Sequence, residues 1–175
     1  MRLHAILLVV FAIAMGTQCD AQGAPCPPLP SGKSWNTPAG YSASKDSIEK
    51  VLRWLCNTPL NVQILQRSEA NACVLIWLAG TSEVTVNVDT RSLPFLELDE
   101  ELLFPVVHGM TLYQLNHPKE CDLIKLHAKG LENLAYLALQ SEALRSEKML
   151  KPLFRAHRRG ELNEYVKSNL SDRKS

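Results

Sequence analysis

Apolar residues recur at helical spacing along most of the chain beyond residue 43. The first clear case is residues 44–57, where every third or fourth position is apolar and Ser44 can cap the start. The residues that share this face are Ile48, Val51, Leu52 and Leu55. The pattern predicts a helix over 44–57, which ends before Pro59.

A second helix is predicted over 61–79, and a change of period follows it. The face that we expect to point inward carries Leu65, Ala72, Cys73, Ile76 and Ala79. From Glu83 to Asp89, three valines alternate with polar residues, which is the period of a strand with one buried face. The sequence therefore predicts one short β element after the second helix.

Helical spacing returns after this element and continues almost to the end of the chain. Four further helices are predicted, over residues 101–117, 119–144, 147–158 and 161–169. Gly130 lies inside the longest of them, where it weakens the helix by about 1 kcal/mol relative to alanine and lets a neighbour approach closely. We therefore expect a mainly α fold, a compact antiparallel bundle of about six helices with one short β element.

The N-terminus has the pattern of a secretory signal peptide. Arg2 precedes an uninterrupted apolar run from Ala5 to Ala14, which is shorter than the about 20 residues that cross a membrane. Small residues then frame a cleavage site, and we expect residues 1–21 to be removed after Ala21. The mature protein is predicted to be secreted or periplasmic and to keep no transmembrane segment.

Composition divides the rest of the chain into three parts. Residues 22–42 are rich in proline and glycine and cannot form a regular hydrogen-bonded ladder, so they predict an extended arm. Residues 43–170 predict the helical domain, and residues 171–175 a flexible tail. A mature chain of roughly 150 residues is long enough for one domain with a substantial core.

Cysteine usage agrees with export. Removal of the leader takes Cys19 and leaves an even set of four candidates for disulfide bonds, namely Cys26, Cys56, Cys73 and Cys121. Two disulfides are expected in an oxidising compartment, and three connectivities are open. We favour pairing Cys56 with Cys73 and Cys26 with Cys121. A zinc site is the alternative, but the chain has no Cys-x-x-Cys pair.

Charge excludes little at the level of the whole chain, because 19 basic and 18 acidic residues give a net charge of +1. No nucleic-acid partner is expected. The segment from Arg145 onward is different, since it carries nine basic and four acidic residues. Its residues that we expect to contact a polyanion or a protein partner are Lys148, Lys151, Arg155, Arg158 and Arg159.

Candidate chemistry is sparse, and we predict no catalytic residue, cofactor site or metal site. His117, Cys121 and His127 are the nearest approach to a metal set, but Pro118 interrupts the helix that would align the first two. The acids at 99–101 fit a helix start better than a glycosidase pair. The chain also lacks the Gly-x-Ser-x-Gly turn of serine hydrolases.

Two segments carry a family resemblance. WLAGTSEVTVNVD (Trp77 to Asp89) and RRGELNEYV (Arg158 to Val166), separated by two long helices, resemble exported bacterial proteins of uncharacterised function. The resemblance implies a helical domain with a short extended element and brings no active residues with it.

The function expected from these patterns is that of a non-enzymatic exported module that binds another macromolecule or has a structural role. Two alternatives remain. One is a small exported hydrolase or inhibitor-like factor, whose site is assembled from residues distant in sequence. The other is an envelope-associated protein that attaches through its basic C-terminal segment.

Overall fold

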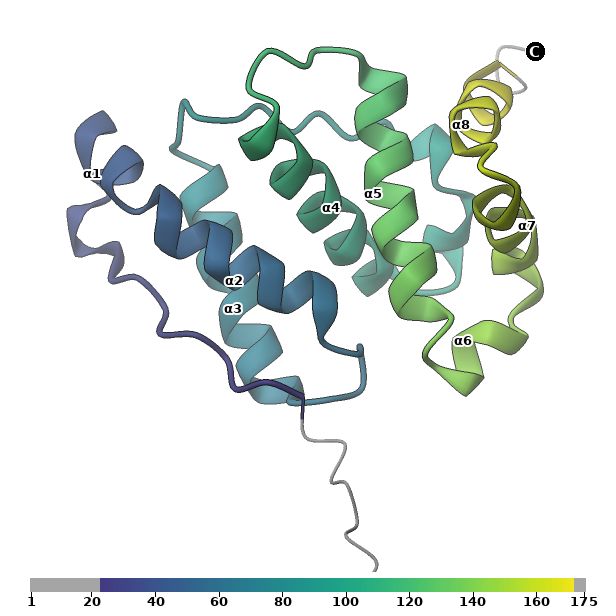
Figure 1. Ribbon diagram of the computed structural model, residues 1–175, viewed down its shortest axis with the longest axis horizontal. Helices are drawn as coiled ribbons and strands as arrows, with labels where there is room; N and C mark the ends of the chain where they lie inside the picture. The colour runs from purple at the N-terminus through teal and green to yellow at the C-terminus, as the bar shows by residue number, and fades with distance from the viewer. Residues whose placement is uncertain (1–22, 172–175) are drawn as a thin grey trace, which may run out of the picture.

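The computed structural model describes residues 23–171, which form a mainly helical fold (Figure 1). The predicted leader 1–21 lies outside the described residues, as do the last four residues of the predicted tail. The α-helices are α1 (Pro38–Ala43), α2 (Lys45–Asn57), α3 (Ile64–Leu78), α4 (Leu103–Asn116), α5 (Leu123–Ala138), α6 (Glu142–Ser146), α7 (Lys151–Arg159) and α8 (Leu162–Ser171). Short 3₁₀ helices cover Gly32–Ser34, Thr90–Ser92, Pro94–Glu97, Glu100–Leu102 and Lys148–Leu150.

Helices α4 and α5 lie side by side at the centre of the molecule (Figure 1). Helices α2 and α3 lie on one side of this pair, and α7 and α8 lie on the other. The prediction of a mainly α fold is confirmed. None of the described helices is both long enough and apolar enough to cross a membrane.

Helix α2 follows the sequence prediction closely. It begins at Lys45, and its predicted inward residues are fully buried. These are Ile48, Val51, Leu52 and Leu55. The helix ends at Asn57, two residues before Pro59. Its apolar face forms the centre of one of two hydrophobic clusters, to which α3 contributes Val74 and Trp77.

Helix α3 forms where it was predicted, but the prediction of its inward face is wrong. Leu65 is 76% exposed and Ile76 is 60% exposed. The buried face instead carries Arg67, Ala70, Val74 and Trp77. Because apolar residues occupy both sides of this helix, their spacing does not determine which side meets the core. Trp77 is completely buried on the face that meets the core, and its Nε1 donates to the carbonyl of Tyr41 at 3.1 Å.

The predicted strand over 83–89 is not present in the described structure. The segment is extended, with Val84 buried, but it pairs with side chains instead of another strand. Thr85 N–H donates to Gln114 Oε1 of α4 at 3.0 Å, and Asp89 N–H donates to His127 Nε2 of α5 at 3.2 Å. The alternating pattern therefore indicated correctly that one side of the segment is buried, but residues 23–171 contain no neighbouring strand that could complete a sheet.

Glycines let α4 and α5 approach closely. A Cβ atom at Gly130 of α5 would lie 2.6 Å from the carbonyl oxygen of Val106. A Cβ atom at Gly109 of α4 would lie 2.8 Å from the carbonyl oxygen of Lys129. The expectation that Gly130 permits close approach is confirmed, and Gly109 is its counterpart on the facing helix.

The predicted long helix over 119–144 is divided in the structure. Helix α5 begins after Asp122, whose Oδ1 accepts the backbone N–H of Ile124 at 2.9 Å, and ends at Ala138. The chain then turns into the short helix α6, which Ser141 caps. Helices α7 and α8 complete the second hydrophobic cluster by placing Leu153, Phe154, Leu162 and Val166 against α4 and α5.

Candidate functional site

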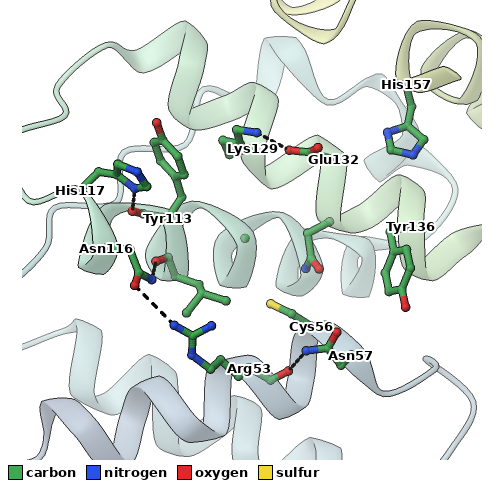
Figure 2. Close-up of a pocket in the computed structure, with 13 residues that line it drawn as sticks. Arg53, Cys56, Asn57, Tyr113, Asn116, His117, Lys129, Glu132, Tyr136 and His157 are labelled. Carbon is green, nitrogen blue, oxygen red and sulfur yellow. Dashed lines mark hydrogen bonds and ion pairs between the residues drawn. The ribbon is translucent and has the colours of Figure 1, made fainter. Parts of the chain in front are cut away.

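An open groove of about 690 Å³ lies between α2, α4 and α5, with His157 of α7 at one end (Figure 2). Figure 2 shows Arg53 and Cys56 directed from α2 toward α4. Gly109 of α4 and Asn133 of α5 also line the groove. The absence of a side chain at Gly109 therefore serves both the close helix crossing and the depth of the groove.

One wall of the groove is aromatic and cationic. The Tyr113 ring stacks on the His117 imidazole with 4.1 Å between ring centroids. The ammonium groups of Lys125 and Lys129 lie 5.7 and 5.8 Å from the centre of the same ring. Cations at this distance are attracted to the face of an aromatic ring. Tyr136 adds a second ring, which is 49% exposed.

Arg53 forms the opposite edge of the groove. Its Nη2 lies 2.5 Å from Glu49 Oε1 and donates to Asn116 Oδ1 at 3.4 Å. Across the groove, Lys129 Nζ lies 2.7 Å from Glu132 Oε2. These are exposed pairs, which contribute little to stability because water competes for both partners. Their side chains are therefore available to a ligand.

Cys56 lies in the groove but is a poor nucleophile. Burial raises the pKa of its thiol to about 12, and the nearby Arg67 and Arg53 offset this effect only in part. A thiol reacts as its thiolate, so a raised pKa suppresses reactivity at neutral pH. The groove is consequently suited to binding rather than to cysteine chemistry.

A serine and a histidine also meet, outside the groove, in a way that the sequence did not reveal. His127 Nδ1 lies 2.7 Å from Ser92 Oγ, and Ser92 Oγ donates to the carbonyl of Asp89 at 2.8 Å. Ser92 is completely buried, and the Asp89 carboxylate binds Arg91 instead of His127. The pair therefore lacks both the exposed hydroxyl and the oriented carboxylate of a hydrolase triad.

Two further polar side chains, Arg67 of α3 and His108 of α4, are buried. Arg67 is 8% exposed and donates to the carbonyls of Leu55 at 3.3 Å and Pro59 at 3.2 Å. His108 is completely buried, and neither ring nitrogen has a partner within the described structure. Burial and the neighbouring Arg67 lower the pKa of His108 to about 3. This histidine is therefore neutral over the physiological range.

The basic residues predicted to contact a partner share one exposed region. Lys148 lies in a 3₁₀ helix, and the other four lie on α7. Within residues 23–171, Arg159 has a carboxylate partner, Glu161, at 3.8 Å, whereas Lys148, Lys151, Arg155 and Arg158 form no ion pair. The structure thus places four of the predicted charges on α7 and the fifth, Lys148, in the 3₁₀ helix that directly precedes it.

The other candidates from the sequence are separated. Asp99 and Glu101 line a cavity with Arg67, while His127 lies among the residues of another. His117 Nδ1 lies 2.9 Å from the carbonyl of Tyr113, in the groove. No three metal-ligating side chains gather among the residues that the structure describes.

All four cysteines in the described part of the chain are free thiols, so the expected disulfides are not seen. Cys56 lines the groove, whereas Cys73 packs against the α2–α3 core beside the arm. Cys121 is exposed between α4 and α5. The structure thus gives no support to the pairing of Cys56 with Cys73 or of Cys26 with Cys121.

Sequence reasoning missed the groove as a site. Its walls come from four helices, so no local motif connects Arg53, Tyr113 and Tyr136. The available signal was Gly109, a glycine within a helical segment, which marks a place where another backbone comes close. No protein-family model, no curated protein and no solved structure matches the chain.

Proposed function

We propose that this protein is an exported, non-enzymatic helical module that binds an acidic peptide segment of a partner protein in the groove between α2, α4 and α5. The leader pattern, the even set of cysteines that it leaves and the groove together support this proposal. Secretion or a periplasmic location is part of it.

The observation that carries the binding role is the lining of the groove. Tyr113 and Tyr136 offer ring surface, which is a frequent feature of protein recognition sites. Arg53 and Lys129 stand on opposite sides, and Lys125 borders Tyr113. Glu132 contributes the single carboxylate of the lining. A peptide with carboxylates and one apolar or aromatic side chain complements this arrangement.

The experiment selects short random peptides on the purified full chain and measures their affinities by fluorescence anisotropy. Peptides enriched in Asp and Glu are expected, with binding that weakens as salt screens the charges. The double variant Arg53→Glu, Lys129→Glu is expected to lose about tenfold or more in affinity, since like charges then face the ligand. Tyr136→Ala tests the apolar contact.

Lys50→Glu is the matched control, because Lys50 is exposed on α2 but does not line the groove. It makes the same charge change on the same helix as Arg53→Glu and is expected to leave the affinity within twofold of wild type. Equal losses in Lys50→Glu and Arg53→Glu would move the site away from the groove. Failure to enrich any peptide would remove the proposed function.

The basic face of α7 supports a second candidate function, attachment to an anionic surface. Among the described residues, three cations of α7 (Lys151, Arg155 and Arg158) and Lys148 just before it form no ion pair, and this cluster is the observation that favours it. Co-sedimentation with vesicles containing anionic lipid, at low and high salt, tests this attachment. Arg155→Glu combined with Arg158→Glu is expected to abolish it, whereas equal sedimentation of wild type and variant would exclude this role.

A further inference from the structure

The N-terminal arm is fastened to the helices immediately before Cys26. Trp54 Nε1 of α2 donates to the carbonyl of Ala24 at 2.7 Å. Gln63 Nε2, at the start of α3, donates to the carbonyl of Gly23 at 3.0 Å. Both donors belong to the helical domain, so this part of the arm is held against it. Cys26 follows two residues after the anchored Ala24.

The position of Cys26 is restricted further by its neighbours in sequence. Pro25 and Pro27 flank it, and each proline ring fixes one backbone angle near −65°. Cys26 Sγ lies 3.4 Å from the carbonyl oxygen of Pro27. The two prolines restrict the backbone on either side of Cys26, and its side chain packs against the cluster of α2 and α3.

Cys26 and Cys73 pack against the same hydrophobic cluster. Both are half-buried and pack against the hydrophobic cluster of α2 and α3. The pKa of Cys26 is raised by burial and by the Glu69 carboxylate, and that of Cys73 by burial and by Cys26. Glu69 and Cys73 are four residues apart on α3 and so lie on adjacent turns of one face. Cys73 lies on this face of α3, and Cys26 packs with it against the same cluster of α2 and α3.

We propose that Cys26 and Cys73 form a disulfide bond that ties the arm to α3, while Cys56 and Cys121 remain thiols. The surroundings of the last two differ, because Cys56 lines the groove and Cys121 lies exposed between α4 and α5. The presence of the bond in the native protein rests on the proposed export, since thiols stay reduced in the cytosol. The choice of partners rests on the anchored arm and on the packing of both cysteines against the α2–α3 cluster.

The bond forms by exchange with a disulfide oxidant, either glutathione disulfide or a protein disulfide donor. One cysteine sulfur attacks the oxidant, whose S–S bond breaks and releases a first thiol. The second cysteine sulfur then displaces the remaining half of the oxidant as a second thiol. Cys26 and Cys73 lose two protons and two electrons in total, and the oxidant gains them.

The surroundings favour a structural bond over a catalytic one. Exchange is fast when the departing thiol has a low pKa, and burial raises the pKa of both sulfurs here. The closed loop, residues 26–73, contains α1, α2 and most of α3. A crosslink across a loop of this length restricts the unfolded chain strongly and so stabilises the fold.

The first test maps the bond directly. The reduced full chain is incubated with glutathione disulfide and reduced glutathione, treated with an alkylating agent in denaturant, digested and analysed by mass spectrometry. A peptide pair that joins Cys26 to Cys73 is expected, with no protein crosslink at Cys56 or Cys121. A different pairing, or no crosslink between cysteines, would overturn the proposal.

The second test measures thermal stability with and without reductant. Reduction is expected to lower the Tm of wild type by about 5–15 °C. Cys26→Ser, Cys73→Ser and the double variant should all resemble reduced wild type and respond to reductant no further. Cys121→Ser is the control and should behave as wild type does. Additive losses in the two single variants would instead indicate separate packing roles.

Export is tested separately by alkylating the protein in intact source cells before lysis. A cytosolic protein that keeps its leader and has all five cysteines alkylated would refute export and leave the pairing measured in the glutathione buffer intact. An exported protein with a different native pairing would refute the disulfide and leave export intact. The two failures are therefore distinguishable.

Discussion

His127 Nδ1 lies 2.7 Å from Ser92 Oγ, in a buried contact that joins α5 to the 3₁₀ helix Thr90–Ser92. The other ring nitrogen lies 3.0 Å from the carbonyl oxygen of Asn87 and accepts the N–H of Asp89 at 3.2 Å. One imidazole thus organises the backbone from 87 to 92. Its Nε2 accepts the N–H of Asp89, as a carbonyl oxygen of a neighbouring strand would in a sheet.

Ser92→Ala is therefore expected to destabilise the fold. The variant leaves the Nδ1 of His127 buried without its partner, which costs about 1–3 kcal/mol in the free energy of unfolding. Urea denaturation measures the loss, and amide exchange at Asp89 should accelerate. Ser146→Ala is the control, since Ser146 is exposed. Equal stability of the two variants would contradict the proposed role of the pair.

Gly130→Ala should destabilise the fold, although alanine is the better helix former. The added methyl group would lie 2.6 Å from the Val106 carbonyl oxygen, so α4 and α5 must move apart. We expect a net loss of about 1–3 kcal/mol in the free energy of unfolding. Ser68→Ala on the exposed side of α3 should change it by less than about 0.5 kcal/mol. A stabilised Gly130→Ala variant would show that the helices separate easily.

His108 predicts a dependence of stability on pH. Its pKa is about 3 when folded and about 6.5 when unfolded. Between these two values the unfolded chain binds a proton at His108 that the folded chain does not. The contribution of neutral His108 to the free energy of unfolding is therefore complete above pH 6.5 and decreases as the pH falls. The slope approaches about 1.4 kcal/mol per pH unit.

Urea denaturation of wild type and His108→Leu between pH 7 and pH 5 tests this dependence. The variant is expected to have a flatter profile, because the buried imidazole is gone. His157→Leu removes an imidazole at the end of the groove and serves as the comparison. Parallel profiles for wild type and His108→Leu would contradict the assignment.

Arg67→Lys should be costly despite the conserved charge. The guanidinium group donates to the carbonyls of Leu55, Thr58 and Pro59, and one ammonium group cannot reproduce its planar geometry. We expect a loss of about 2–4 kcal/mol in the free energy of unfolding, measured with urea. Arg53→Lys, in an exposed pair on α2, should cost less than about 0.5 kcal/mol. Similar losses in both would show that Arg67 does not hold the end of α2.

The sequence by itself determined where the main helices of the domain lie, α2 and α3 most clearly, and where α4 and α5 approach closely. The buried face of α2 could be predicted because its apolar residues lie on a single side, and all of them are buried in the structure. Gly130 predicted that a neighbouring helix approaches α5 closely, since a glycine within a helix leaves free the space that a side chain would fill. These features depend on residues near one another in the chain.

Tertiary structure decided everything that depends on distant partners. Helix α3 has apolar residues on both sides, and packing against α2 chose the side with Val74 and Trp77. The alternating segment 83–89 has no partner strand in the part of the chain that the structure describes, and side chains of α4 and α5 bond part of its backbone. The groove arises only where α2, α4 and α5 converge. Local periodicity describes one element at a time, and it contains no information about which elements become neighbours.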